Sequence, residues 1–317
     1  MMIYEIIYSM SDRQAEHSLP DALKEIYGGR AEEDWESFRK KHKALSQEQL
    51  LREFEQYPSC NYSFFLREAN IRGLASEISK KQGNNWNVLS VGCGYGPEPY
   101  ELAMRLVKGG KTEFKIDAID VSPATIKKAQ EGKFTIGDYI GSSTEREFFD
   151  EMSNAGVLRY VGERKTRSSK VIEYGVTDEV KSHIAFSVHD IIEGPVLPHN
   201  QVPYDLVICN TVLQHYPPWT RQLIVANIME NMKDGALLAL EHNEWLNGIA
   251  MTPERVSWLE PYYKWKETEL PKLGLIPEEI TPEGFLLPLT VYRYNAYLNP
   301  YKGKNLAIRN MQVIEAK

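Results

Sequence analysis

The sequence predicts an α/β fold, a mostly parallel and doubly wound sheet, and three segments support this prediction. The first, Asn84 to Met104 (NNWNVLSVGCGYGPEPYELAM), combines a short apolar strand, a glycine-rich turn and an amphipathic helix. The second, Phe114 to Asp120, is an apolar run followed by another helical pattern. The third, Tyr204 to Cys209, has the continuous apolar character of a strand buried on both faces. A strand, a tight turn and a helix in this order are typical of a nucleotide-binding βαβ unit.

The spacing of the glycines distinguishes between two classes of nucleotide ligand. Gly92, Gly94 and Gly96 follow a G-x-G-x-G pattern, whereas a dinucleotide fingerprint requires G-x-G-x-x-G. The next helix opens with Glu98, whose carboxylate would repel a pyrophosphate but could bind the ammonium group of an amino-acid-like cofactor. We therefore predict an S-adenosylmethionine site and disfavour a nicotinamide oxidoreductase.

An acid ends the second predicted strand. Asp120 is placed to bind two ribose hydroxyls, and Ser122 with Pro123 has the pattern of a helix N-cap and first turn. The alternative is that Asp120 only forms the turn. The paired glycine turn and strand-end acid favour the ribose contact.

Five segments resemble one enzyme family when taken in their order along the chain. They are NYSFFLREA (Asn61 to Ala69), GCGYGPEPYELAM, IDAIDVSPATIKKAQEGKF, HDII (His189 to Ile192) and YDLVICNTVLQHY (Tyr204 to Tyr216). Together they resemble the CheR-type methyltransferases, which use S-adenosylmethionine to methylate glutamate side chains of chemotaxis receptors. The resemblance implies a class I methyltransferase fold with an antiparallel edge to its sheet, and it spans roughly Asn61 to Glu244.

The resemblance also implies roles for individual residues. Ser63 and Arg67 match family residues near the methionine carboxylate and the active centre, and Asp190-Ile191 stands where the family contacts adenine. Arg67 would act as a charge-assisted clamp on a carboxylate. The expected cofactor-binding residues are Ser63, Arg67, Gly92, Gly94, Gly96, Glu98, Asp120, Val121, Asp190, Ile191 and Asn210.

One block departs from the family pattern. After the strand ending at Cys209, the family has C-R-N-V-x-x-Y, but here Asn210 replaces the Arg, Thr211 the Asn and His215 the Tyr. His215 can accept a proton near neutral pH, although a packing or helix-cap histidine is the alternative. We therefore expect His215, Arg67 and Asn210 to be the catalytic residues. His242 and Glu244, after the next strand, are weaker candidates for the same cleft.

This departure favours methyl transfer to O or N of a small molecule, including one that bears a carboxylate. Two alternatives stay open. The first is a receptor-like glutamate O-methyltransferase acting on a protein, and the second is a protein that binds the cofactor without catalysis.

Composition excludes several other classes. With 317 residues and 42% hydrophobic content the chain can bury a full core, and a net charge of −7 disfavours nucleic-acid binding. Three scattered cysteines (Cys60, Cys93, Cys209) predict neither disulfides nor zinc, and the histidines form no H-x-x-x-H pair, so no metal is expected. No apolar run is long enough to span a bilayer, which predicts a cytoplasmic protein with no membrane partner. The sequence does not predict the oligomeric state.

The domain organisation follows from changes in pattern. We predict an N-terminal helical cap over residues 1–80 and a methyltransferase domain over 81–317. This domain would contain an insert at about 134–183 and an aromatic extension at 248–317. In the resembled family such an insert is a small antiparallel sheet that docks on the receptor. Its basic run, Arg159 to Lys170, is more simply explained as a solvated hairpin.

The last part of the chain gives three more expectations. A helix over Trp219 to Met232 should end at Gly235, and strand-like runs at Leu286 to Tyr297 and Leu306 to Ile314 should include the antiparallel edge. The extension's aromatic cluster is expected to wall the substrate pocket, with core filling as the alternative. The cluster consists of Trp258, Tyr262, Tyr263 and Trp265.

Overall fold

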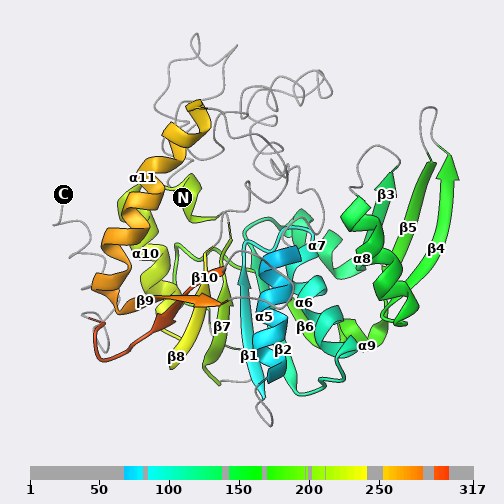
Figure 1. The fold of residues 1–317 in the computed structure, drawn as a ribbon, viewed down its shortest axis with the longest axis horizontal. Helices are drawn as coiled ribbons and strands as arrows, with labels where there is room; N and C mark the ends of the chain where they lie inside the picture. The colour runs from blue at the N-terminus through cyan, green and yellow to red at the C-terminus, as the bar shows by residue number, and fades with distance from the viewer. Residues whose placement is uncertain are drawn as a thin grey trace.

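A seven-stranded, mostly parallel sheet forms the centre of the protein (Figure 1). Its strand order is β6-β2-β1-β7-β8-β10-β9, and a separate three-stranded sheet has the order β3-β5-β4. This confirms the predicted α/β class and its antiparallel edge. The computed structural model describes residues 68–80, 85–137, 143–165, 170–196, 198, 202–210, 212–240, 253–280 and 289–299.

The elements of the main sheet and its covering helices alternate along most of the chain. In chain order they are α5 (Glu68–Lys80), β1 (Trp86–Val91), α6 (Pro97–Lys108), β2 (Phe114–Asp120), α7 (Pro123–Glu131), β6 (Ile184–Val188), β7 (Tyr204–Ile208), η1 (Leu213–His215), α10 (Pro218–Met229), β8 (Met232–Ala239), α11 (Pro253–Glu269), η3 (Pro271–Leu273), β9 (Leu275–Ile280) and β10 (Leu289–Tyr294). No helix among the described residues is both long and apolar enough to cross a membrane.

The chain reverses its direction of winding at β1. This strand pairs in parallel with β2 on one side, where Val88 lies opposite Ile116, and with β7 on the other, where Val88 lies opposite Leu206. The connections from β1 and from β7 therefore leave in opposite directions. The carboxyl ends of these two strands form the topological switch point of the sheet, which we call the crevice. In doubly wound sheets this is where ligands bind.

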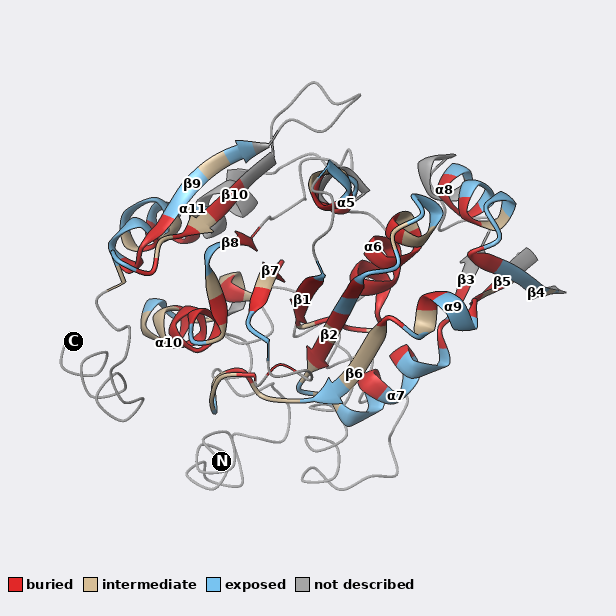
Figure 2. Ribbon diagram, turned by 90° about the horizontal axis from the view of Figure 1, so that it is seen from below, coloured by how far each residue is buried: buried red, intermediate tan, exposed pale blue. Residues whose placement is uncertain are grey.

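Helices cover both faces of the sheet. On one face α5 and α6 pack against the sheet. The contacts of α5 use residues at helical spacing such as Ile71, Leu74 and Ile78, which are at most 2% exposed. On the other face α10 and α11 join a second buried cluster. Figure 2, seen from below, shows β1 coloured as buried between these two layers, whereas the outer strands β6 and β9 are largely intermediate or exposed. The central parallel strands β1 and β7 thus have the double-sided burial that their continuous apolar runs predict.

The strands found at the antiparallel edge of the sheet agree only in part with those predicted. The expected run Leu286 to Tyr297 contains β10, which pairs antiparallel with β8 and β9, whereas Leu306 to Ile314 lies outside the described residues. The edge strand β9, Leu275–Ile280, was not predicted. Its pattern is broken by Pro277 and two glutamates, which an outermost strand tolerates because one side of its backbone needs no partner.

The expected end of the helix before β8 is wrong. The helix α10 ends at Met229, and Gly235 lies inside β8 with a φ of 78°. Between the β7–β8 pairs Tyr204–Met232 and Leu206–Leu237 the register shifts. Gly235 is therefore part of an irregularity in the strand and does not stop the helix.

The segment predicted as an insert holds its own small sheet. The elements are β3 (Lys133–Gly137), α8 (Ser143–Asn154), β4 (Leu158–Lys165), β5 (Lys170–Val176) and α9 (Asp178–Lys181). Figure 1 shows this sheet projecting at the side of the molecule beyond β6. Both neighbours of β5 pair with it antiparallel.

The basic run lies on β4 and β5 of this small sheet. On the outer strand β4, Tyr160 and Val161 are 56% and 52% exposed, and the register shifts between Tyr160 and Gly162. The side chain of Arg159 is also exposed. The described part of the run, Arg159 to Glu163, is thus mostly exposed, and it also exposes apolar surface; residues 166–169 lie outside the described residues.

Candidate functional site

The glycine turn at the end of β1 depends on backbone conformations that other residues rarely adopt. Gly92, Gly94 and Gly96 have φ values of 66°, 55° and 87°. A Cβ atom on Gly92 would lie 2.5 Å from Cγ2 of Val212, in the segment that follows β7. The turn is therefore packed closely against the segment that follows β7.

Asp120 ties this turn to the end of β2. One carboxylate oxygen accepts from the N–H of Gly94 at 3.1 Å, and the other accepts from the N–H of Ser122 at 3.0 Å. Burial raises the pKa of Asp120, while the backbone N–H groups of Ser122, Gly94 and Val121 oppose that shift. Ser122 also caps α7 as predicted, since its Oγ accepts from the N–H of Thr125 at 3.2 Å. The ionised carboxylate has further lone pairs with which to accept from hydroxyls.

A buried carboxylate and amide meet across the mouth of the crevice. Glu98, in the first turn of α6, accepts through Oε1 from Nδ2 of Asn210, just after β7, at 3.1 Å. Glu98 is 8% and Asn210 2% exposed. The structure thus brings together two predicted residues that lie 112 positions apart. Because the amide of Asn210 is directed at Glu98, this position belongs to the expected cofactor side of the crevice.

The loop after β6 lies beside the end of β2. The N–H of His189 donates to the carbonyl of Asp120 at 3.1 Å, and Oδ1 of Asp190 accepts from the N–H of Ile192 at 2.9 Å. Ile191 is 6% exposed and belongs to the core, whereas Val121 is 62% exposed. The pair expected at the adenine therefore lies close to Asp120.

Several expected site residues have no described side chain. The backbone of His215 lies in η1, directly after β7, but its side chain is outside what the structure describes. Ser63 and Arg67 lie outside the described residues altogether. So do Thr211, His242 and Glu244. Their roles stay predictions.

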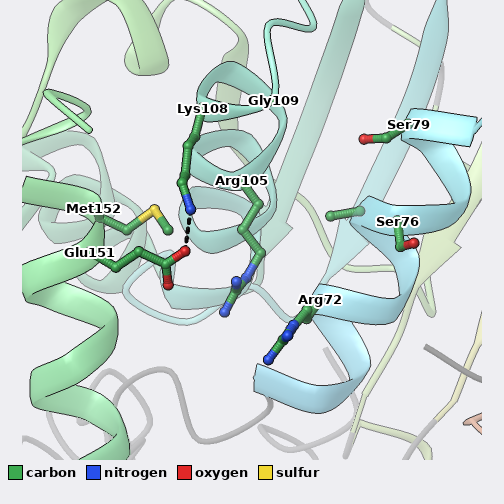
Figure 3. A pocket seen from close by; sticks show the side chains of 9 residues that line it. Arg72, Ser76, Ser79, Arg105, Lys108, Gly109, Glu151 and Met152 are labelled. Carbon is green, nitrogen blue, oxygen red and sulfur yellow. Dashed lines mark hydrogen bonds and ion pairs between the residues drawn. The ribbon is translucent and has the colours of Figure 1, made fainter. Parts of the chain in front are cut away.

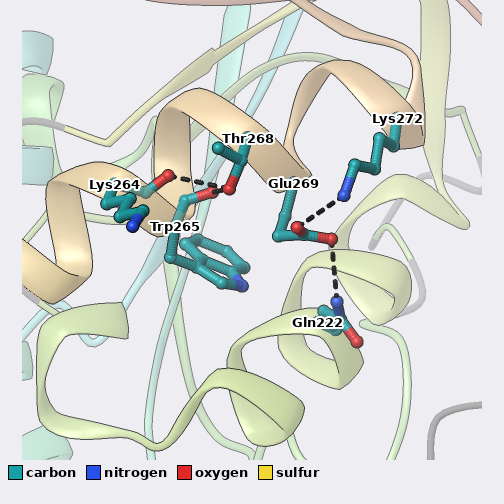
Figure 4. Close-up of polar contacts among 6 residues, drawn as sticks. All are labelled: Gln222, Lys264, Trp265, Thr268, Glu269 and Lys272. Atoms are coloured by element: carbon teal, nitrogen blue, oxygen red, sulfur yellow. Dashed lines mark hydrogen bonds and ion pairs between the residues drawn. The ribbon is translucent and has the colours of Figure 1, made fainter. Parts of the chain in front are cut away.

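The expected pocket-wall role of the aromatic extension is wrong for two of its residues. Tyr262 and Trp265 on α11 are 2% and 5% exposed and belong to the core against α10. A polar contact also joins the two helices, since Glu269 of α11 accepts from Gln222 of α10, and the same carboxylate pairs locally with Lys272 (Figure 4). Tyr263 is partly buried, and the side chain of Trp258 is not described. Aromatics fill the core here, which was the alternative.

One buried residue at the crevice was not predicted. Arg221 on α10 is 7% exposed, and its Nε donates to the carbonyl of Leu213 in η1 at 2.9 Å. A signal was present in the sequence, because Arg221, Ile224, Val225 and Ile228 have the i, i+3, i+4, i+7 spacing of a buried helix face. A cation on a buried helix face is unusual, and it indicates that the side chain has a specific polar partner.

One pocket of the described residues lies away from the crevice. This pocket of about 400 Å³ lies between α5, α6 and α8, lined by residues that include Arg72, Arg105 and Lys108 (Figure 3). It lies at the opposite end of α6, about 18 Å along the helix from the glycine turn. Two of its three cations are paired, Lys108 with Glu151 and Arg105 with Glu101. The strand ends, and not this pocket, carry the candidate site.

The described part of the chain contains no cluster of three or more His, Cys, Asp or Glu residues able to hold a metal. Cys93 and Cys209 are free and buried, and burial raises the pKa of both thiols. Neither is therefore suited to act as a thiolate nucleophile. By contrast, the glycine cradle and the carboxylates of Glu98 and Asp120 fit an S-adenosyl cofactor, with an acid for its ammonium group and an acid for its ribose.

Comparison with known proteins agrees with this geometry. The family model described as the CheR methyltransferase, SAM-binding domain, matches residues 61–257. WspC, a probable biofilm formation methyltransferase of Pseudomonas aeruginosa, is 28% identical over 159 residues, which are 49% of this chain and 33% of that protein. A chemotaxis protein methyltransferase of Listeria monocytogenes is 24% identical over 201 residues, 62% of this chain and 69% of that protein.

The chain therefore spans only about a third of the length of WspC. Among solved structures, the plantazolicin methyltransferase BpumL aligns at 10% identity and a TM-score of 0.43 over 86% of this chain and 96% of that one, too distant to bear on function. The family model covers more than half of the sequence and includes every element of the crevice. The chain belongs to the CheR family of S-adenosylmethionine-dependent methyltransferases.

Proposed function

We propose that the chain transfers the methyl group of S-adenosylmethionine to a carboxylate side chain of a protein and so forms a methyl ester. The observation that carries this proposal is the small antiparallel sheet. Its outer strand β4 leaves one backbone edge unpaired within the sheet and exposes Tyr160 and Val161. An open strand edge with exposed apolar side chains suits an extended protein segment and has no evident use for a small molecule. Relatives named as chemotaxis protein methyltransferases favour the same class of acceptor.

The crevice residues would hold the cofactor by complementary charge and hydrogen bonding. Glu98, already fixed by Asn210, would bind the ammonium group, and Asp120 would accept from the ribose hydroxyls. The backbone around Gly92 and Gly94 would lie against the cofactor, and Arg67 would orient the acceptor carboxylate. When bound, the cofactor supplies an electrophilic methyl group on a sulfonium sulfur.

The proposed reaction is an in-line displacement. An oxygen of the ionised carboxylate forms a bond to the methyl carbon as the carbon–sulfur bond breaks, and the sulfur keeps the electron pair. The products are a neutral ester and S-adenosylhomocysteine, and no proton is transferred. Positioning and exclusion of water therefore supply the catalysis, and no general base is needed.

The stability of the methylated product to alkali tests whether the acceptor is a carboxylate. We expect methyl-labelled cofactor to label the cytoplasmic domain of a chemotaxis receptor, and mild alkali to release that label as volatile methanol, because esters hydrolyse in base. Free glutamate at equal carboxylate concentration is the matched acceptor. Label that survives alkali, or equal labelling of free glutamate, would contradict the proposal.

The exposed strand offers a second test. Val161→Asp should lower kcat/KM for the receptor domain by about tenfold, since one lost apolar contact and one buried charge each weaken an interface at this scale. Binding of S-adenosylhomocysteine should not change. Val161→Ala removes apolar contact without adding a charge, and so separates the two contributions.

A small-molecule acceptor is the second candidate, favoured by Asn210 and His215 in the altered block. Turnover of the His215→Ala variant across pH separates the two. A carboxylate is ionised throughout the neutral range, so any loss should be the same at every pH. A loss of roughly 10²–10⁴ that shrinks as pH rises would instead mean that His215 removes a proton from a hydroxyl or ammonium acceptor.

A further inference from the structure

We propose that Arg221 is a positioning residue for this methyltransferase: its guanidinium fixes the turn after β7 against the glycine turn that binds the cofactor. The inference does not depend on the identity of the acceptor, because it concerns the wall of the crevice. It rests on one chain of contacts that runs from α11 through Arg221 to η1 and on to Gly92.

The guanidinium binds the backbone of η1. Its Nε donates to the carbonyl of Leu213 at 2.9 Å, and Nη2 approaches the carbonyl of Gln214 at 3.5 Å. Both acceptors belong to the same 3₁₀ turn, and the N–H of Tyr216 closes that turn on the Leu213 carbonyl at 3.2 Å. A planar fork of donors on adjacent carbonyls constrains the orientation of the turn as well as its position.

Two rings of the C-terminal extension hold the guanidinium in place. The Cζ atom of Arg221 lies 5.2 Å from the ring centroid of Tyr262 and 5.7 Å from that of Trp265. These rings stack on each other at 6.3 Å, and the hydroxyl of Tyr262 reaches the carbonyl of Leu240, after β8, at 3.5 Å. Cation–π contacts at this distance stabilise a desolvated cation. These two rings of the extension thus influence the site through Arg221.

The turn that Arg221 holds is itself part of the crevice. Val212 immediately precedes η1, and its Cγ2 lies where a side chain on Gly92 would begin. Two positions earlier, Asn210 binds Glu98. A displacement of η1 would therefore disturb the glycine turn and the expected ammonium site together.

Stability alone does not account for this cation. Among the described residues no carboxylate lies within ion-pairing distance of Arg221, and its Nη1 is buried without a hydrogen-bond partner. Burial accordingly lowers the pKa of Arg221. An apolar side chain of similar length would avoid this desolvation. The charge is explained by the two carbonyls that it orients.

The test compares Arg221→Met with Arg293→Met. Arg293 also donates to a carbonyl, that of Gly235 at 2.9 Å, but it lies on β10 and also pairs with Glu278. We expect Arg221→Met to weaken binding of S-adenosylhomocysteine in calorimetry by about five- to tenfold while Tm shifts by only a few degrees. Arg293→Met should lower Tm and leave affinity unchanged.

Hydrogen exchange supplies a readout that a general loss of stability would not reproduce. In Arg221→Met the amide of Tyr216 should exchange faster well below Tm, and Arg221→Lys, which keeps the cation and one donor, should recover part of the affinity. Unchanged affinity and unchanged exchange at residues 212–216 would overturn the proposal. It would also be overturned if Arg221→Met and Arg293→Met both lost affinity in proportion to their loss of Tm. If Arg221→Met does not fold, the affinities of Trp265→Leu and Trp265→Phe are compared instead. Only the leucine variant leaves no aromatic ring beside the guanidinium of Arg221, so only it should lose affinity.

Discussion

The Gly92→Ala variant should lose at least tenfold in affinity for S-adenosylhomocysteine. The added Cβ would lie 2.5 Å from Cγ2 of Val212, a separation at which one of the two segments must move. The φ of 66° adds backbone strain of about 1–2 kcal/mol for a residue other than glycine. Both effects act on the backbone that is expected to face the cofactor, and calorimetry measures the result.

Two further variants separate the clash from the strain. Gly110→Ala places the same side chain at a φ of 74° with no atom within 4 Å, so it should lose stability without losing affinity. Combining Gly92→Ala with Val212→Ala removes the clashing methyl group and should restore part of the binding. If Gly110→Ala weakened binding as much as Gly92→Ala, packing against Val212 would not be the cause.

Replacing Asp120 with alanine should weaken cofactor binding by about tenfold or more, since a charged acceptor of hydrogen bonds is lost. The change removes the expected ribose contact and also releases the N–H groups of Gly94 and Ser122. Asp205→Ala is the matched control, because Asp205 also accepts from a backbone N–H, that of Asn87, but at the amino end of the strands. Unchanged binding in Asp120→Ala would remove this residue from the site.

The pKa of Asp120 sets the direction of its pH dependence. Burial raises that pKa in the folded protein, so the contribution of Asp120 to stability is fully present below its unfolded pKa and is lost as pH rises through the folded value. At neutral pH the ionised group therefore lowers the free energy of unfolding of the ligand-free protein. Bound hydroxyls would offset that cost, and affinity should fall as pH drops through the folded pKa.

The central strands and the cofactor turn could be predicted from the sequence because their signals are local. The range Phe114 to Asp120 agrees with β2 at both ends, and the glycines at 92, 94 and 96 mark the turn directly. The strand β9 was not predicted because Pro277 interrupts its sequence pattern. Gly235 was misassigned because, in sequence, a glycine inside a bulged strand resembles one that ends a helix.

The contacts that shape the crevice could not be predicted in the same way. Val212 meets Gly92, and Arg221 meets Tyr262, across long stretches of chain. Neither pairing leaves a local pattern. The aromatic extension shows the same limit, since a ring in a core and a ring on a pocket wall have the same identity and spacing in sequence.

The pairing of β1 with β7 has a consequence for how the protein folds. The two strands that bound the crevice are 118 residues apart, as the contact between Asn87 and Asp205 shows. Closing so long a loop costs conformational entropy before any contact is gained, which makes this pairing a late and slow step. A nascent chain that has emerged only as far as β6 already has the glycine turn but lacks Asn210 and Val212. Cofactor can therefore stabilise only the completed sheet, and its presence should slow unfolding without accelerating refolding.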